Sequence, residues 1–196
     1  MHIGEIRIIL ILFILLIYDC DEVKFGKMKA LISVFNKDKV IEFARVLNEL
    51  GIEVIATEGT AKLILKSGIP VTKVSAFTGF QEMLGGKVKT LHPRIHAGIA
   101  TAEIGIVAVN LIPFDLSTKN PLNSMDIGGV AMLRSGIKNF ENVAVIINPA
   151  RYDAIIEELG KRGELSHDTK LSLAKEASEY ILAYESKIDM ILKTFS

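Results

Sequence analysis

The sequence predicts an α/β protein with a doubly wound, mainly parallel five-stranded sheet, helices on both faces of that sheet and a long C-terminal helix. Short continuous runs of Val, Ile and Leu alternate along the chain with segments of helical periodicity. This alternation is typical of parallel strands that are covered on both faces. A length of 196 residues, with 49% apolar and 23% charged residues, excludes a disordered chain and is sufficient for one domain with a packed core.

Residues 1–27 are expected to be an apolar N-terminal extension that is not part of the native domain. The unbroken apolar run from Ile8 to Ile17 is too short to cross a membrane as a helix, which needs about 20 residues, and no signal-peptide cleavage site follows it. Three interpretations remain open: a membrane-proximal anchor, a β-rich segment that packs on the domain, or upstream sequence translated from a misassigned start. We prefer the third, because Met28 directly precedes a strand pattern. A single domain is therefore predicted at residues 28–196.

Three strands and two helices are predicted in the first half of this domain. The strands are expected at 30–34, 52–56 and 71–74, and the helices at 40–50 and 60–66. Gly51 and Gly68 follow the two helices, and glycine is common at this position because it readily adopts the left-handed conformation that ends a helix. A loop rich in Gly and Lys is expected from Gly85 to His96.

The second half continues the same alternation of strands and helices. Strands are expected at 105–111 and 143–147, and helices at 130–138, 149–159 and 168–193. The last helix has an apolar face along its length, formed by Leu171, Ala174, Ala177, Ile181, Tyr184, Ile188 and Ile191. This face either packs on the sheet or pairs with another subunit.

Charge and cysteine content limit the partners and the location of the protein. The chain has 23 basic and 23 acidic residues, and the resulting lack of net charge argues against a nucleic-acid partner. The single cysteine, Cys20, excludes an intramolecular disulfide and favours the cytoplasm. Mean hydropathy is +0.36, but residues 1–27 contribute part of that value, so it does not indicate a membrane protein.

Two turns that follow predicted strands carry hydroxyl groups suited to an anion. The first is the segment 33–37 (Ser-Val-Phe-Asn-Lys), and the second is the segment 57–60 (Thr-Glu-Gly-Thr). In doubly wound sheets ligands bind outside the carboxyl ends of the strands, where helix N-termini offer free N–H groups. Both turns, with Lys37 beside them, would suit a phosphate monoester. The alternative is ordinary helix capping by Asn36 and Thr57.

The glycine-rich segment 85–93 (Gly-Gly-Lys-Val-Lys-Thr-Leu-His-Pro) is a further candidate. It is either a flexible cationic loop that closes over an anionic ligand or a solvated basic loop. His92 and His96 have the four-residue spacing of some metal ligands, but Pro93 lies between them and no acidic residue completes a set, so no metal site is predicted.

The turn from Asp126 through Ile127 and Gly128 to the next glycine leads into a predicted helix. Successive N–H groups at such a turn can hold a developing oxyanion. Asp126 and Lys138, at the two ends of this segment, are candidates for a carboxylate–ammonium proton relay. The alternative is that Asp126 is a helix N-cap and Lys138 an unrelated surface residue.

The segment 87–93, followed by Ile95-His96-Ala97-Gly98, resembles the signature of IMP cyclohydrolase, the N-terminal domain of the bifunctional AICAR transformylase/IMP cyclohydrolase of purine biosynthesis. The resemblance extends from Ala30 to the final helix, and its other matching segments are 78–86, 33–34 with Lys37, 126–130, 133–134 and 138–139. It implies a methylglyoxal-synthase-like fold, a homodimer, and a reaction without a metal or organic cofactor.

The resemblance also implies a reaction. IMP cyclohydrolase closes the ring of 5-formamidoimidazole-4-carboxamide ribonucleotide to give IMP, the last step of de novo purine synthesis, and belongs to the cyclic amidine hydrolases acting in the ring-closing direction. By motif, Lys89 would stabilise charge near the reacting amide or formyl oxygen, and Asp126 with Lys138 would handle the proton. The N–H groups around Ile127 and Gly128 would face the oxyanion.

The remaining implied site residues bind the substrate, a small purine nucleotide precursor. The 5′-phosphate, the ribose and the base would be held by Ser33, Lys37, Thr57, Gly59, Thr60, Lys87, Val88, Thr90 and Asn110, the last of these near the base. Because no transformylase domain is expected in this chain, a separate formyl-transferring enzyme would make the substrate.

Several residues depart from the family pattern and keep an alternative function open. Ile112 stands where relatives have Tyr, and loss of a hydroxyl that acts as a general acid would cost about 10²–10⁴ in rate. Glu58 replaces a Gly in the phosphate turn, and Phe35 replaces a hydroxyl residue. The alternative is a non-catalytic or degenerate purine-nucleotide-binding module of the same fold. Methylglyoxal synthase itself is a third hypothesis, but the segment 87–93 matches it less well.

Overall fold

The structure is a computed structural model that describes residues 28–86 and 88–195, and the statements below refer to these residues. The predicted N-terminal extension (1–27) and the predicted binding role of Lys87 therefore lie outside the described residues.

Five parallel strands form one sheet at the centre of the domain. The strands are β1 (Lys29–Val34), β2 (Glu53–Ala56), β3 (Thr72–Lys73), β4 (Ile104–Asn110) and β5 (Ala144–Ile146). Their order across the sheet is β3-β2-β1-β4-β5, and every neighbouring pair is parallel. All seven residues of β4 are buried, which explains its unbroken apolar sequence. The predicted fold class is confirmed.

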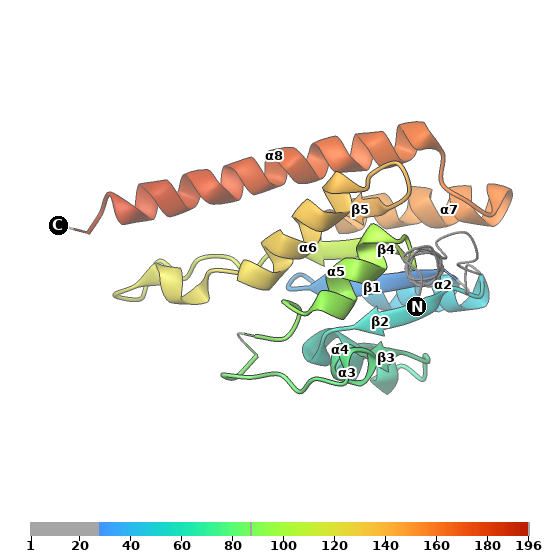
Figure 1. Ribbon diagram of the computed structural model, residues 1–196, viewed down its shortest axis with the longest axis horizontal. Coiled ribbons are helices and arrows are strands. Elements are labelled where there is room, and N and C mark those ends of the chain that lie inside the picture. Colours follow the sequence, from blue (N-terminus) through green and yellow to red (C-terminus); the bar gives the residue numbers. More distant parts are fainter. Residues whose placement is uncertain (1–27, 87, 196) are drawn as a thin grey trace, which may run out of the picture.

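Helices cover both faces of the sheet. On one face lie α2 (Val40–Glu49), α3 (Glu58–Lys66) and α7 (Tyr152–Arg162), which share a core with alternate residues of β1 such as Ile32. On the other face lie α4 (Val74–Thr78), α5 (Pro93–Ala100), α6 (Ile127–Lys138) and α8 (His167–Leu192), which share a core that includes Leu31. Figure 1 shows α5, α6 and α8 side by side on this second face. Because successive side chains of a strand point to opposite faces, neighbouring residues of β1 belong to different cores.

Besides small shifts at the ends of several elements, the structure differs from the sequence prediction at α4, α5 and α6. The third strand ends at Lys73, and Val74 begins α4. A helix, α5, begins at Pro93 within the segment predicted as a loop to His96, since Pro is compatible with the first helical turn and the His92 ring accepts a hydrogen bond from the N–H of Arg94 at 3.2 Å. Helix α6 begins at Ile127, three residues before the predicted start, because Asp126 caps the helix there by accepting a hydrogen bond from the N–H of Gly129.

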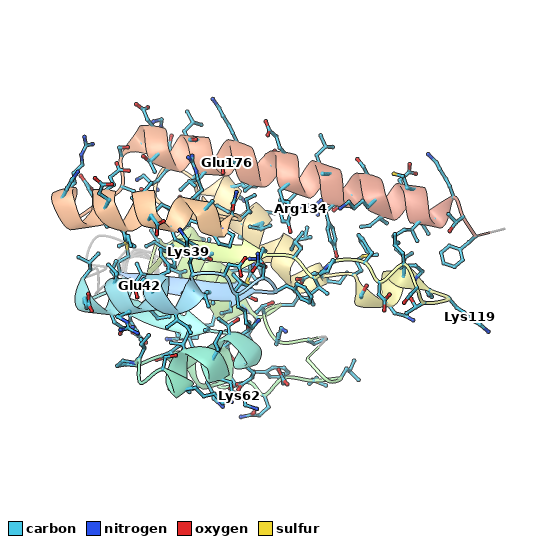
Figure 2. All side chains as sticks on the ribbon, turned by 180° about the vertical axis from the view of Figure 1, so that it is seen from behind. Lys39, Glu42, Lys62, Lys119, Arg134 and Glu176 are labelled. Carbon is cyan, nitrogen blue, oxygen red and sulfur yellow. The ribbon has the colours of Figure 1, made fainter. Side chains whose placement is uncertain are left out.

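The long C-terminal helix packs on the domain as far as Tyr184 and extends beyond the sheet at its C-terminal end. Ala177, Ile181 and Tyr184 are buried against β5 and α6, which confirms one of the two roles considered for the apolar face. Toward the C-terminus, Met190 and Leu192 are exposed. Figure 2 shows Lys119 at the tip of the β4–α6 connection, which extends away from the sheet in the same direction as the C-terminal end of α8.

Two short 3₁₀ helices, Pro121–Ser124 and Pro149–Arg151, complete the described elements. Among residues 28–86 and 88–195, none of the helices combines the length and the hydrophobicity needed to cross a membrane.

Two glycines in helices are expected to respond in opposite ways to the same substitution. A Cβ at Gly136 of α6 would lie 2.6 Å from Cγ2 of Val145 in β5, whereas a Cβ at Gly160 of α7 would have no atom within 4 Å. Gly136→Ala should therefore lower the free energy of unfolding by about 1–3 kcal/mol. Gly160→Ala should raise it by about 0.5–1 kcal/mol, because Ala is the better helix former. Urea unfolding measures both, and stabilisation by Gly136→Ala would contradict this account of α6 packing.

Candidate active site

The strand order reverses between β1 and β4, and the polar residues of the site gather there. The chain moves outward from β1 to β2 and β3, then returns to pair β4 with the other side of β1. Val34 and Asn110, the last residues of the two strands, are register partners. Helices that leave two adjacent parallel strands in opposite directions open a crevice at their carboxyl ends.

Asn110 fixes the turn that follows β1. Its Oδ1 accepts hydrogen bonds from the N–H groups of Phe35 at 2.6 Å and Asn36 at 2.8 Å, and its Nδ2 donates to the carbonyl of Asn36 at 3.1 Å. Asn110 is buried, so these bonds satisfy an amide that would otherwise destabilise the fold. In this arrangement Asn110 holds in place the two residues that directly precede Lys37.

Hydroxyl groups and a helix N-terminus meet beside this turn. The Thr57 Oγ1 donates to the Ser33 Oγ at 3.3 Å, and the Thr60 hydroxyl, which is only 1% exposed, donates to the Val34 carbonyl at 3.4 Å. Thr57 precedes α3 but its side chain does not cap that helix, so the capping considered as an alternative is not observed there. Helix geometry leaves the first-turn N–H groups, including that of Gly59, directed out of the helix end, where they favour an anion.

Glu58 does not face this group of hydroxyls. Its carboxylate contacts Lys73 Nζ at 2.9 Å and accepts a hydrogen bond from the Ser75 hydroxyl at 2.7 Å. The hydrogen bonds from Lys73 and Ser75 hold the pKa of Glu58 below its ordinary value. The acid that replaces the family glycine is therefore compensated on the side of α4.

Lys37 and Lys89 bring two positive charges to the same region. Lys37 Nζ donates to the Val34 carbonyl at 2.8 Å, and partial burial together with the positive charge of Lys89 lowers its pKa. In the described part of the chain neither ammonium group forms an ion pair with a carboxylate. Two like charges held together without counter-ions favour the binding of an anion between them.

A cleft of about 440 Å³ adjoins these charges. Its walls come from the glycine-rich loop, Ile112 just after β4, and the segment before and within the first turn of α6. The lining residues are Gly85, Gly86, Lys89, Thr90, Ile112, Leu122, Asn123, Ser124, Met125, Asp126, Ile127 and Gly128. The structure therefore brings five of the predicted site residues to one cleft: Lys89, Thr90, Asp126, Ile127 and Gly128.

Asp126 is the N-cap of α6. Its Oδ1 accepts a hydrogen bond from the N–H of Gly129 at 2.7 Å, and its Oδ2 accepts one from the N–H of Ile112 at 3.4 Å. Because the N–H of Gly129 is used, those of Ile127 and Gly128 are the first-turn donors left to face the cleft. Asp126 is thus the helix N-cap that the alternative interpretation expected, and it also lies next to the predicted oxyanion donors.

Gly128 is required by the close approach of the glycine-rich loop. A Cβ at Gly128 would lie 2.2 Å from the Thr90 Oγ1, and Thr90 is buried. Loop and helix meet without space for a side chain, so Thr90 forms part of the cleft floor. Val88 closes the same loop through backbone hydrogen bonds with Met83, at 2.9 and 3.3 Å.

The structure does not bring Lys138 to Asp126 within one chain. Lys138 is the last residue of α6, Asp126 precedes the first, and a helix of 12 residues is about 18 Å long. Lys138 is also exposed. The predicted proton relay between these two residues is therefore not formed in a single chain, because helical geometry places them at opposite ends.

For two residues that support the site, the structure shows a role that the sequence alone did not predict. His96, considered only as a metal ligand, has its Nδ1 2.8 Å from the Ser135 hydroxyl and bonds to the backbone of Thr90. Among the described residues, no group of three His, Cys, Asp or Glu side chains is arranged to hold a metal ion. Tyr184, assigned only to an apolar face, contacts Asp126 and Ile112 through its hydroxyl. Neither role has a local sequence signal, since each depends on segments distant in the chain.

The fold and this cleft define the class: a doubly wound α/β domain with a cleft, lined by Lys89, Asp126 and the start of α6, near the point where the strand order reverses. Residues 39–133 match the MGS-like domain family, and residues 136–196 match part of the AICARFT/IMPCHase bienzyme family. The crystal structure of ForH is similar, with a TM-score of 0.77 and 30% sequence identity over 85% of this chain and 100% of the ForH chain. The chain therefore contains an MGS-like domain followed by a partial AICARFT/IMPCHase region, which is the domain architecture of the IMP cyclohydrolase part of the AICARFT/IMPCHase bienzyme.

Burial of His96 predicts a pH-dependent stability. Desolvation lowers the pKa of His96 from its ordinary value of 6.5, so the unfolded chain binds this proton more readily than the folded chain. The stabilisation is present above pH 6.5 and is lost as the pH falls toward the folded-state pKa. The free energy of unfolding, measured above and below that value, should change less in His96→Gln than in the wild type. An exposed-site control, His167→Gln, should keep the wild-type dependence; equal pH dependence in all three proteins would contradict the prediction.

Proposed function

We propose that this chain is an IMP cyclohydrolase, which closes 5-formamidoimidazole-4-carboxamide ribonucleotide (the formamido substrate) to IMP. The observation that carries the proposal is the pair of unneutralised ammonium groups, Lys37 and Lys89, beside a cleft that also holds helix N–H donors and Asp126. The domain architecture supports it, because it is that of the cyclohydrolase part of the bienzyme.

The phosphate of the substrate is assigned to the end of β1 and the start of α3. Ser33, Thr57 and Thr60 supply hydroxyls, Gly59 supplies a first-turn N–H, and Lys37 supplies charge. A phosphate monoester is recognised by this combination, since it has several acceptor oxygens and a charge of almost two. Asn110 acts here mainly by holding the turn of Lys37, and the proposal keeps its assignment near the base, which the resemblance implies.

The chemistry is assigned to the cleft between the glycine-rich loop and α6. The carboxamide nitrogen forms a bond to the formyl carbon, and negative charge moves to the former formyl oxygen. This oxygen is protonated and leaves as water, while the carboxamide nitrogen and the formamido nitrogen each lose one proton over the whole reaction. Lys89 and the N–H groups of Ile127 and Gly128 would stabilise the charged oxygen, and each such donor contributes roughly 3–4 kcal/mol.

Asp126 is the carboxylate available at this cleft for proton transfer. Each of its oxygens accepts one backbone hydrogen bond and keeps a second acceptor position. Lys138 is left out of this step, because α6 holds it away from the cleft of its own chain. The proposal retains Thr90 and Val88 as residues that shape the binding loop.

The proposed assembly is a cytoplasmic homodimer supplied with substrate by an enzyme that transfers a formyl group. Exposed apolar side chains on the outer part of the molecule favour self-association. They are Leu116, Leu182, Met190, Leu192 and Phe195.

Removing the Lys89 ammonium should abolish turnover while leaving the fold intact. In Lys89→Ala, kcat should fall by at least about 10²-fold, because a charge stabilising the oxyanion is lost. The matched control Lys66→Ala removes the same charge from the exposed last turn of α3. The measurement is the rise in purine absorbance as the formamido substrate becomes IMP. Unchanged turnover in Lys89→Ala would reject the assigned site.

A non-catalytic purine-nucleotide-binding module is the second candidate, and Ile112 favours it. This side chain lines the cleft and is 37% exposed, where relatives carry a tyrosine hydroxyl. The cleft therefore keeps its charges and N–H donors but has a methyl-bearing group in place of a proton donor. Such a site would bind IMP without converting the formamido substrate.

Ile112→Tyr distinguishes an eroded enzyme from an active one. If the hydroxyl is the missing general acid, this substitution should raise turnover by about 10²-fold or more. If the wild type is already an efficient enzyme, the bulkier ring should leave turnover equal or lower. Calorimetric titration with IMP shows whether binding is retained in either case, and absence of both IMP binding and turnover in the wild type would reject both candidates.

A further inference from the structure

The hydroxyl of Tyr184 joins two cleft segments that are 14 residues apart in the chain. It accepts a hydrogen bond from the N–H of Asp126 at 2.8 Å and donates one to the carbonyl of Ile112 at 3.1 Å. Tyr184 lies on α8 and is only 5% exposed, so the bonds are largely shielded from water. Both segments line the cleft, while the tyrosine itself stands behind them.

Tyr180, one helical turn earlier on α8, acts on the same wall. Its hydroxyl accepts a hydrogen bond from the N–H of Leu111 at 3.0 Å. Burial raises the pKa of both Tyr180 and Tyr184, so both phenols stay protonated near neutral pH. The ring of Phe114 stacks on Tyr184 with centroids 4.6 Å apart, which restricts the rotation of the ring. We call Tyr180 and Tyr184 the tyrosine pair.

The tyrosine pair connects α8 to the groups that would meet the reacting atoms. The Tyr184 bond is made to the N-cap residue of α6, so it sets the direction of the N–H groups of Ile127 and Gly128. The bond to Ile112 sets the position of the opposite wall. The Tyr184 hydroxyl thus fixes the distance between the Ile112 wall and the start of α6. The 3.4 Å hydrogen bond from the Ile112 N–H to Asp126 has the same effect.

We propose that Tyr184, supported by Tyr180, is a positioning residue that holds the oxyanion-facing start of α6 and the Ile112 wall at the separation needed for ring closure. This inference rests on the proposed cyclohydrolase function. Phosphate binding is assigned to β1 and α3, whereas the hydrogen bonds of the tyrosine pair in the described residues go to Leu111, Asp126 and Ile112, so substrate affinity should depend little on the pair. The pair therefore contributes mainly to the chemical step.

Tyr184→Phe tests the proposal because it removes the hydroxyl and keeps the ring that stacks on Phe114. We expect kcat for the formamido substrate to fall roughly 10- to 100-fold, since small displacements of aligned groups have effects of this size. KM should stay within about threefold, because phosphate binding is retained. Tyr180→Phe, which keeps both Tyr184 bonds, should lower kcat by a smaller factor.

Tyr152→Phe is the matched control. Tyr152 lies on α7, on the opposite face of the sheet, is 2% exposed, and stacks on Phe43 with centroids 4.0 Å apart. The same hydroxyl is thus removed from an equally buried ring that does not contact the cleft. Its kcat and KM should both stay near the wild-type values, and melting temperatures of all variants report any loss of folding.

The outcomes separate this proposal from the proposed function. An active wild type with unchanged kcat in Tyr184→Phe would overturn the positioning role and leave the cyclohydrolase function standing. A parallel rise in KM and fall in melting temperature, with kcat retained, would show a merely structural role and also overturn it.

If the wild type shows no turnover, the cyclohydrolase function fails, and amide hydrogen exchange then tests whether Tyr184 holds the start of α6 in place. The Asp126 amide should exchange at least about tenfold faster in Tyr184→Phe than in Tyr152→Phe, and equal rates would refute it.

Discussion

The site depends on the way Asn110 joins the ends of two parallel strands. β1 and β4 are neighbours in the sheet, but the chain leaves them toward opposite sides, which opens a crevice with exposed backbone groups. Asn110 closes part of that crevice by binding the backbone of Phe35 and Asn36. This arrangement orients Lys37, and the other site elements pack around the fixed turn.

Two helix N-termini face the crevice and give it a preference for negative charge. α3 begins beside the hydroxyls of β1, and α6 begins at the cleft with Asp126 as its N-cap. Each first turn has N–H groups that no residue of the same helix accepts, and the helix dipole adds to their effect. Gly128 allows the glycine-rich loop to approach the second of these turns, since any larger residue would collide with Thr90. The same backbone geometry thus produces both the preference of the crevice for negative charge and the shape of the cleft.

The distribution of side-chain charge completes this picture. Glu58, in the first turn of α3, is held by Lys73 and Ser75. Lys37 and Lys89 form no ion pair with a carboxylate among the described residues, and partial burial together with the positive charge of Lys89 lowers the pKa of Lys37. A protein with no net charge can therefore hold two lysines without acidic partners near one site, because pairing is decided locally and not by the total count.

The sequence by itself determined the fold class, the positions of the five strands to within one or two residues at each end, and the identity of the motifs that line the cleft. These follow from local patterns, since hydrophobic periodicity and strand–turn–helix order depend on neighbouring residues. Helix α5 was missed because eight residues with a short apolar face give little periodic signal. Only the tertiary structure decided that Glu58 turns toward α4, that Lys138 lies at the far end of α6, and that Tyr184 contacts both walls of the cleft. Each of these results depends on the direction of a side chain relative to a distant segment, and that direction is set by packing rather than by local sequence.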